Sequence, residues 1–324
     1  MSAERGGPSG SPFSFWLAKI SGMKRRTAAG LWLLAAASMA CGASEGSTAA
    51  TAPAAAPPAP NAPVAPLAPS APIIPRAEAE LRPPCEQGQL EKCVELGDRL
   101  RERAEPDFAG AIELYDRACS ASVALGCAQL GLMYQDGLGV PEDGERARDL
   151  YTRSCDAGTA RACSRLGAMF LVGAFAPRNV EQAYARNDQG CSGGDGLGCL
   201  NLALMHRNGD GVKRDAERAL ELARKSCDAN EGRGCTLLGE MTAAGHGTPP
   251  NATLGMMQNM KGCDLGDGRG CGNVGVSYQV GAGTPSDPKR ASELFARACK
   301  AGEQRFCDLL KRFQQDALKA ASAP

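Results

Sequence analysis

The cysteines of this chain recur at a fixed period. After Cys41 they form seven pairs, and in each pair the second cysteine follows the first by eight residues. The first step from pair to pair is 34 residues, and the next five steps are 36 residues each. A period in this range predicts a solenoid of stacked repeats, a fold that offers an extended surface to a partner. The pairs are Cys85/Cys93, Cys119/Cys127, Cys155/Cys163, Cys191/Cys199, Cys227/Cys235, Cys263/Cys271 and Cys299/Cys307.

Disulfide bonds explain these pairs better than a metal array does. The chain has only two histidines and no Cys-x-x-Cys motif, the close spacing that zinc sites use. In one unbroken helix, residues eight apart are separated by about 12 Å, whereas a disulfide needs a Cα separation of about 4.4–6.8 Å. Each pair is therefore expected to span a turn between two helices. Seven disulfides require an oxidising compartment, and the alternative is buried free cysteines in a cytosolic repeat protein.

Residues 1–41 match the plan of a signal peptide. A basic cluster, Lys24–Arg26, precedes a short apolar run at residues 31–37, and small residues suited to cleavage follow. The apolar run is too short to remain as a membrane-spanning helix. Met23 stands directly before the basic cluster, so the chain is expected to start at either Met1 or Met23. This segment predicts export, in agreement with the compartment that the cysteines require.

Cys41 is the one cysteine outside the seven pairs. Ser38-Met39-Ala40-Cys41 resembles the lipobox of bacterial lipoproteins, in which the cysteine is lipidated and becomes the first mature residue. That motif usually has leucine where this chain has Ser38, and the same residues suit an ordinary signal peptidase. The resemblance implies lipidation of Cys41, and the alternative is a secreted protein without an anchor.

Residues 42–84 consist almost entirely of alanine, proline, serine and threonine. Eleven of the 21 prolines lie between Pro53 and Pro84. Such a segment cannot bury a core, and proline removes backbone donors that helices and sheets need. It is expected to be a disordered, extended linker that precedes a folded domain at residues 85–320.

Each 36-residue unit is expected to contain two helices. After the second cysteine of a pair, apolar residues recur at the third, sixth and seventh positions, as in Leu130, Met133 and Tyr134. This spacing places them on one face of a helix. A glycine within the stripe, such as Gly131, lets a neighbouring helix approach closely, and glycines such as Gly137 end the helix. A second apolar stripe precedes the next pair of cysteines.

These units resemble the Sel-one-like repeat, a relative of the tetratricopeptide repeat. The resemblance is carried by Leu-Gly-x-Met-Tyr-x-x-Gly-x-Gly-Val at residues 130–140 and by Ala-x-x-Leu-Tyr at residues 147–151. The paired cysteines are similar to those of the secreted, cysteine-rich (Hcp-type) bacterial members. The resemblance implies an all-α, right-handed α/α solenoid of six to seven helix-turn-helix units. It also implies that disulfides join the second helix of one unit to the first helix of the next. The first unit departs from the pattern because it lacks the Gly-x-Gly-Val loop.

The same resemblance implies a groove that binds a partner. In tetratricopeptide-like solenoids the first helix of each unit lines the concave face. The expected groove is apolar with scattered arginines, which suits an extended peptide with a carboxylate or an acidic residue. The alternative is an ordinary solvated face with incidental apolar residues. The expected groove residues are Leu132, Gln135, Arg161, Leu171, Leu200, Leu204, Arg207, Arg233, Glu240, Arg269, Val276 and Gln279.

The Hcp-type members also imply an alternative function, a weak β-lactamase or penicillin-binding activity. Serine β-lactamases need Ser-x-x-Lys together with Ser-Asp-Asn and Lys-Thr-Gly elements. Ser286–Lys289 matches the first element, but neither of the others occurs. The same residues suit the start of a helix, where serine or aspartate before proline is a common cap. No catalytic residue, metal or cofactor is therefore expected.

Charge favours a protein partner over nucleic acid. Lysine plus arginine and aspartate plus glutamate each number 36, so the chain has no basic excess. His206 and His246 have no ligand partner in the sequence and are expected to be incidental. The chain is thus predicted to be an exported protein- or peptide-binding scaffold of the cell envelope. It is expected in the periplasm or outer membrane as a lipoprotein, and otherwise as a secreted protein.

Overall fold

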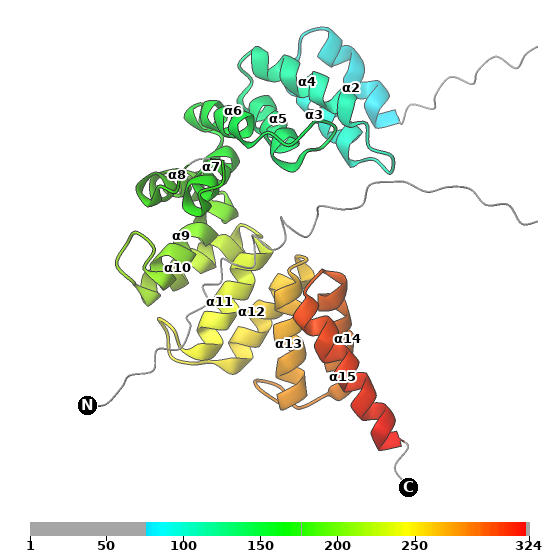
Figure 1. Cartoon of the computed structure of the whole chain (residues 1–324), viewed down its shortest axis with the longest axis vertical. Helices are drawn as coiled ribbons and strands as arrows, with labels where there is room; N and C mark the ends of the chain where they lie inside the picture. Colours follow the sequence, from blue (N-terminus) through cyan, green and yellow to red (C-terminus); the bar gives the residue numbers. More distant parts are fainter. Residues whose placement is uncertain (1–75, 176, 322–324) are drawn as a thin grey trace, which may run out of the picture. The chain divides into compact units, whose positions relative to one another are not determined.

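The computed structural model of the chain describes residues 76–175 and 177–321 (Figure 1). The expected signal peptide, the lipidation site Cys41 and the linker up to residue 75 lie outside the described residues. Fourteen α-helices and no strand make up the regular structure of the described part. None of these helices is both long enough and apolar enough to cross a membrane.

The helices alternate between two roles. Twelve of them, α3 to α14, are thirteen residues long, so equivalent residues in different units share a position numbered from 1 to 13. The first helices are α3 (Leu90–Glu102), α5 (Ala124–Asp136), α7 (Ala160–Val172), α9 (Gly196–Asn208), α11 (Gly232–Ala244) and α13 (Gly268–Val280). The second helices are α4 (Phe108–Ser120), α6 (Gly144–Asp156), α8 (Val180–Ser192), α10 (Ala216–Asp228), α12 (Ala252–Asp264) and α14 (Pro288–Lys300). The flanking helices are α2 (Arg76–Glu86) and α15 (Gln304–Ala321).

The predicted all-α solenoid is confirmed by the packing of these helices. Consecutive helices pack against each other along the whole series (Figure 1). Among the described helices, extensive contacts between non-consecutive ones join only first helices, namely α3 with α5, α7 with α9, α9 with α11 and α11 with α13. The first helices α7, α9, α11 and α13 therefore lie side by side in one layer, and α3 lies beside α5 in the same way. We call the surface made by positions 2, 6, 9 and 12 of these helices the first-helix face.

Capping residues determine where the helices begin and end. Asp143 and Asp287 precede second helices, and their carboxylates accept hydrogen bonds from the backbone N–H groups of Arg146 and Arg290 at 2.9 and 3.0 Å. The first helices from α5 to α13 end at glycines in the left-handed conformation, such as Gly137 with φ of 65°, whereas α3 ends at Arg103 in an extended conformation. These residues give every unit the same boundaries.

Loop length explains why the first step between cysteine pairs is shorter than the others. Residues 103–107 join α3 to α4, whereas residues 137–143, with the Gly-x-Gly-Val segment, join α5 to α6. The first loop is two residues shorter, while the helices on both sides keep their thirteen residues. The missing loop motif therefore shortens the connection and leaves the helix pair intact.

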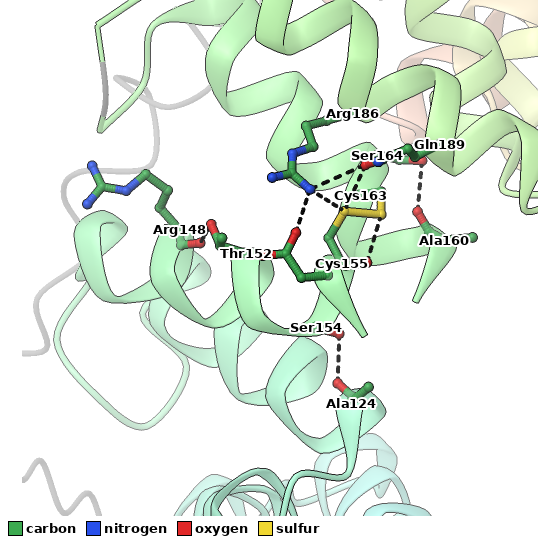
Figure 2. Close-up of a disulfide and its surroundings, with 11 residues drawn as sticks. Ala124, Arg148, Thr152, Ser154, Cys155, Ala160, Cys163, Ser164, Arg186 and Gln189 are labelled. Carbon is green, nitrogen blue, oxygen red and sulfur yellow. Dashed lines mark hydrogen bonds and ion pairs between the residues drawn. A yellow bond between two sulfur atoms is a disulfide. The ribbon is translucent and has the colours of Figure 1, made fainter. Parts of the chain in front are cut away.

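All seven predicted cysteine pairs are disulfides. Their Cα–Cα distances lie between 4.3 and 4.7 Å, far below the separation that one continuous helix would impose. Each bond joins an even-numbered helix to the odd-numbered helix that follows, and thus locks the turn between them. Figure 2 shows the bond between α6 and α7. The bonds are Cys85–Cys93, Cys119–Cys127, Cys155–Cys163, Cys191–Cys199, Cys227–Cys235, Cys263–Cys271 and Cys299–Cys307.

The second cysteine of each of the first six pairs is a core residue and not part of an accessible site. Each stands at position 4 of a first helix and is at most 4% exposed. Its Sγ also lies 3.5–3.7 Å from the backbone carbonyl oxygen of the cysteine to which it is bonded. This contact is not a hydrogen bond, because a disulfide sulfur carries no proton to donate. The six buried cysteines are Cys93, Cys127, Cys163, Cys199, Cys235 and Cys271.

The predicted apolar stripes form the core. Leu130 and Met133 of α5 are buried together with Tyr151 of α6. A Cβ placed on Gly131 would lie only 2.9 Å from Cε1 of Tyr151. The recurrent glycine therefore makes room for the ring of the facing helix, as the sequence predicts.

The helical region begins earlier than expected. Helix α2 starts at Arg76 and contains Pro83 and Pro84, so the predicted linker boundary at residue 84 is wrong. Each proline lacks the N–H group that would bond the carbonyl four residues earlier, so the two prolines remove two hydrogen bonds from the helix. Near its start, the buried carboxylate of Glu78 lies 3.7 Å from Nη1 of Arg103. Tertiary packing thus stabilises a helix that local composition disfavours.

Candidate partner-binding face

Most of the predicted groove residues lie on one stripe of the first-helix layer. Positions 2, 6, 9 and 12 are three or four residues apart and therefore share one side of a helix. Arg161, Arg233 and Arg269 occupy position 2, Leu132, Leu204, Glu240 and Val276 position 9, and Gln135, Leu171, Arg207 and Gln279 position 12. Leu200 lies off this stripe, at position 5.

Two of the predicted groove residues are buried, and their assignment to the groove is wrong. Leu200 is 1% exposed and Leu171 is 4% exposed, which excludes direct contact with a partner. Position 5 faces the second helices, since a Cβ on Gly262 of α12 would lie 2.4 Å from the hydroxyl of Thr236, at position 5 of α11. Leucine at position 12 is stabilised by burial, whereas polar residues at this position remain accessible.

Contacts between consecutive first helices reveal their register. Arg269 Nη2 and Asn273 Nδ2 of α13 donate hydrogen bonds to Glu240 Oε1 of α11, at 2.7 and 3.0 Å. At the other end of the series, Gln129 Nε2 of α5 donates to Asp98 Oδ1 of α3 at 2.6 Å. Position 9 of one first helix therefore adjoins positions 2 and 6 of the next.

Arg207, Glu240 and Arg269 come from three consecutive first helices and form one charged cluster. Burial lowers the pKa of the Arg207 guanidinium, the Glu240 carboxylate raises it, and the charges of Arg269 and Arg214 lower it further. Arg207 is thus a partly desolvated cation, and its Nε donates to Asn208 Oδ1 at 3.3 Å. Helical spacing predicts that each residue lies on the face, but not that the three interact.

The other polar residues predicted on the face differ in whether hydrogen bonds or ion pairs within the protein already engage their side chains. Gln135 is engaged within the protein, because its Oε1 accepts a hydrogen bond from the Tyr151 hydroxyl at 3.0 Å. The Arg161 side chain is 69% exposed, and its Nε lies 4.0 Å from the carboxylate of Asp195. Arg233 is exposed, and its guanidinium forms no ion pair with any residue that the structure describes. Arg161 and Arg233 therefore leave most of their charge available.

Aliphatic side chains accompany these arginines on the first-helix face. Val276 is 38% exposed. Leu132 and Leu204, at the same position of α5 and α9, are half-buried, and Gln279 is exposed. The face therefore presents accessible apolar groups beside free guanidinium groups, a combination that can hold a peptide by both its side chains and its charges.

Buried asparagines were missed by the sequence reasoning. Asn201 Nδ2 donates to Asn187 Oδ1 at 2.9 Å, and Asn273 Nδ2 donates to Asn259 Oδ1 at 3.0 Å. These pairs connect a second helix to the next first helix. Their sequence signature is the recurrence of both asparagines after 72 residues, that is, after two units.

Ser286 lies at the start of a helix, as the capping interpretation predicts. Its hydroxyl donates to the backbone carbonyl of Gln279 at 3.2 Å. Asp287 is the capping residue of α14, and Pro288 is the first helical residue. The hydroxyl is therefore engaged with the backbone of the loop.

The model of the Sel1 repeat family matches this chain in six segments that cover more than half of it. The segments are residues 93–123, 124–159, 160–185, 196–231, 232–257 and 269–303. This chain belongs to the Sel1 repeat family. Cys155 falls in the second segment and Cys163 in the third, so their disulfide joins consecutive Sel1 repeats, as the resemblance implies.

Solved structures show the same fold. The c5321 protective antigen of uropathogenic Escherichia coli, which displays an SLR fold, matches with a TM-score of 0.58 and 24% identity, over 74% of this chain and 52% of that protein. This Sel1 repeat chain thus spans about half the length of the antigen. A Sel1 repeat protein from Oxalobacter formigenes matches with a TM-score of 0.58 and 19% identity, over 67% of this chain and 86% of that one. Cysteine rich protein B of Helicobacter pylori matches with a TM-score of 0.35 and 24% identity, over 41% of this chain and 96% of that one. The comparison with curated proteins gave no match.

Proposed function

We propose that this Sel1 repeat protein is an exported scaffold whose first-helix face binds a protein or peptide in the cell envelope. The observation that carries the proposal is the row of accessible side chains on consecutive first helices, which includes Arg161, Leu204, Arg233 and Val276. Solenoids bind partners along such extended faces, because neighbouring units place equivalent residues in a row.

Export is supported by the seven disulfides, which need an oxidising compartment to form and persist. The proposal places a lipid anchor on Cys41 and a tether at residues 42–75, which leaves the solenoid free to reach its partner. Catalysis is not part of the proposal. The Ser286 hydroxyl, which the β-lactamase alternative requires, is hydrogen-bonded to the backbone at a helix start.

Site-specific photo-crosslinking tests the binding face. A photoreactive amino acid at Leu204 is expected to give a crosslinked partner in envelope fractions. The matched control is the same amino acid at Arg224, an exposed residue of second helix α10. A specific adduct at Leu204 alone supports the proposal, and equal labelling at both positions contradicts it.

Intact mass tests the compartment and the anchor. The mature protein, alkylated with and without prior reduction, is expected to show fourteen modifiable thiols only after reduction, because all seven pairs are bonded. A lipid increment on Cys41 is expected as well. An unprocessed chain with freely alkylated thiols would place the protein in the cytosol and overturn the proposal.

A further inference from the structure

Large aliphatic residues recur at position 9 of the first-helix face with a period of two units. At position 9, Leu132, Leu204 and Val276 are each 72 residues apart, and the units between them have Ala168 and Glu240. Position 2 of the following helix completes each pair. In chain order, the pairs are Leu132/Arg161, Ala168/Leu197, Leu204/Arg233, Glu240/Arg269 and Val276/Arg305.

The contact between Glu240 and Arg269 shows that the members of a pair adjoin. Arg269 Nη2 lies 2.7 Å from Glu240 Oε1. Because every unit uses thirteen-residue first helices with the same boundaries, Leu204 adjoins Arg233 in the same way. Position 9 and the next position 2 thus lie together where α9 meets α11 and where α11 meets α13.

Only alternate pairs combine an accessible aliphatic group with an available guanidinium. Glu240 neutralises Arg269, and the pair formed by Ala168 and Leu197 has no charge. In contrast, Arg233 has no ion-pair partner among the described residues, and the Arg161 side chain is 69% exposed. At the end of the series, Arg305 lies over the ring of Phe306, 4.3 Å from its centroid.

The acidic residues that precede α11 and α13 do not neutralise the arginines that follow them, whereas Asp195, which precedes α9, lies 4.0 Å from Nε of the exposed Arg161. The carboxylates of Glu231 and Asp267 accept hydrogen bonds from the backbone N–H groups of Arg233 and Arg269, both at 3.4 Å. They are therefore directed at the helix N-terminus, where they cap backbone donors. The Arg233 guanidinium therefore remains free to bind an external carboxylate.

We propose that the pair Leu204/Arg233 is a subsite for an extended acidic segment of a protein partner, and that the pairs Leu132/Arg161 and Val276/Arg305, which repeat it at 72-residue intervals, are further subsites. The inference rests on the proposed function and names the partner's chemistry. Each subsite binds one carboxylate through its arginine and one neighbouring apolar side chain through its aliphatic residue. A segment that fills two subsites gains affinity because the second contact is intramolecular.

Helix packing sets the spacing of the segment. First helices in contact lie about 8–10 Å apart, so Leu204 on α9 and Val276 on α13, with α11 between them, are separated by about 16–20 Å. An extended chain rises about 3.3 Å per residue, and five to six residues therefore span roughly this distance. The partner is expected to repeat its acidic and apolar pair at this interval.

Fluorescence anisotropy with labelled peptides tests the proposal on the intact protein. The probe is an extended peptide with two Glu-Leu pairs six residues apart in a background of serine and threonine. We expect binding that weakens roughly 100-fold when both glutamates become glutamine, because one charge-assisted hydrogen bond is lost at each of the two subsites. A peptide with the two pairs three residues apart is expected to bind no better than a single pair.

Variants on the same face give matched controls. Arg233→Gln is expected to weaken the Glu-Leu peptide about 10-fold. Arg269→Gln, at the same position of the next helix, is expected to change binding less than about 2-fold, because Glu240 already neutralises that arginine. Glu240→Leu creates a further pair like Leu204/Arg233 and is expected to strengthen binding, with circular dichroism to confirm that the fold persists.

Three results would overturn the inference: no measurable binding of the Glu-Leu peptide, equal binding of the glutamine peptide, or equal effects of Arg233→Gln and Arg269→Gln. None of these would contradict the wider proposal if photo-crosslinking at Leu204 still captured a partner. If the peptide failed to bind and photo-crosslinking at Leu204 also captured no partner, the proposed scaffold function itself would be contradicted.

Discussion

At the residue scale, position 8 matches the two helices of each unit in size. Where the first helix has glycine, a larger side chain of the second helix lies directly against it. The unit with Ala203 instead has alanine, Ala223, at the equivalent place of its second helix. A larger residue on one helix is thus balanced by a smaller one on the other. The five glycine pairs are Gly97/Tyr115, Gly131/Tyr151, Gly167/Asn187, Gly239/Asn259 and Gly275/Phe295.

Gly275→Ala is therefore expected to destabilise the protein even though alanine favours helices. A Cβ on Gly275 would lie 2.6 Å from Cε1 of Phe295, which is fully buried. Overpacking costs about 1–3 kcal/mol and helix propensity returns about 1 kcal/mol, so urea unfolding should show a net loss of about 1 kcal/mol. The comparison variant Ala203→Gly removes a buried methyl group as well as about 1 kcal/mol of helix propensity, so it should lose more than about 1 kcal/mol. A Gly275→Ala variant more stable than the parent would contradict this packing.

Tyr115 and Tyr151 are expected to ionise only when the fold opens. Burial raises the pKa of Tyr115 well above its ordinary value of 10.0, and its hydrogen bond to Asp98 at 2.7 Å raises it further. Burial likewise raises the pKa of Tyr151. Because the folded-state pKa is raised, this contribution to stability is complete below about pH 10 and is lost as the pH rises above it.

An alkaline titration followed by tyrosinate absorbance checks this expectation. Two of the five tyrosines should ionise only together with loss of helical circular dichroism. Tyr115→Phe should remove one tyrosine from this late group. Ionisation of all five in the folded protein would contradict the burial of these rings.

Residue-scale prediction succeeded where a pattern reports on a single helix. The stripe with Leu130, Met133 and Gly131 predicts which side of a helix is buried, and the structure confirms it. Leu171 and Leu200 were misassigned because burial there depends on neighbouring helices, which helical spacing does not reveal. The contact between Glu240 and Arg269 was missed for the same reason, since it depends on the register between units.

At the element scale, a cationic side chain on one second helix binds the carboxyl end of the second helix before it. Arg153 Nη2 of α6 donates to the backbone carbonyl of Cys119 at 3.2 Å, and Lys261 Nζ of α12 donates to that of Cys227 at 3.1 Å. Both cations stand at position 10. They satisfy carbonyls at the ends of α4 and α10, where the helix dipole favours positive charge.

Helix α8 also places a cation at the end of the second helix before it, but from a different position, as Figure 2 shows. Its position 10 is Gln189, and Arg186, one turn earlier, approaches the end of α6 instead. Arg186 Nη1 lies 2.7 Å from Asp156 Oδ1 and 3.4 Å from Cys155 Sγ. In α8 the cation therefore stands one turn before position 10, which glutamine occupies.

Arg153→Gln is expected to weaken the junction between α4 and α6. It removes a charged hydrogen bond to the Cys119 carbonyl, and we expect a loss of about 0.5–1.5 kcal/mol in urea unfolding. The control is Lys225→Gln, because Lys225 also stands at position 10 but pairs with Glu221 within its own helix, at 3.1 Å on an exposed surface. Equal losses in the two variants would show that the Cys119 contact contributes nothing.

Helix boundaries were largely predictable because local residues determine them. Glycines such as Gly137 and caps such as Asp143 act through their own backbone and side chains, whatever surrounds them. Helix α2 is the exception, since Pro83 and Pro84 argue against a helix that packing on α3 nevertheless stabilises.

At the scale of the whole molecule, two periods coexist. Disulfides repeat with every unit, whereas buried asparagine pairs and small residues repeat with every second unit. Gly190 and Gly262, 72 residues apart, lie against Ser164 and Thr236 in the same way. The first-helix face follows the longer period, so alternate units share both their packing and their exposed residues. The two-unit period can be read from the sequence, but the side-chain contacts that it produces depend on which helices pack together.

Because each unit contacts only its neighbours, removing one disulfide should have a local effect that depends on its place in the series. The bond between Cys227 and Cys235 closes a loop of nine residues, and chain entropy assigns it about 2.5 kcal/mol. Replacing both cysteines with alanine weakens an interior junction, so we expect urea unfolding to separate into two transitions. The same change at Cys299 and Cys307 releases only α15 and should leave one main transition with early loss at the carboxyl end. Hydrogen exchange resolved along the chain distinguishes these outcomes, and identical profiles for the two variants would mean that the solenoid unfolds as one cooperative unit.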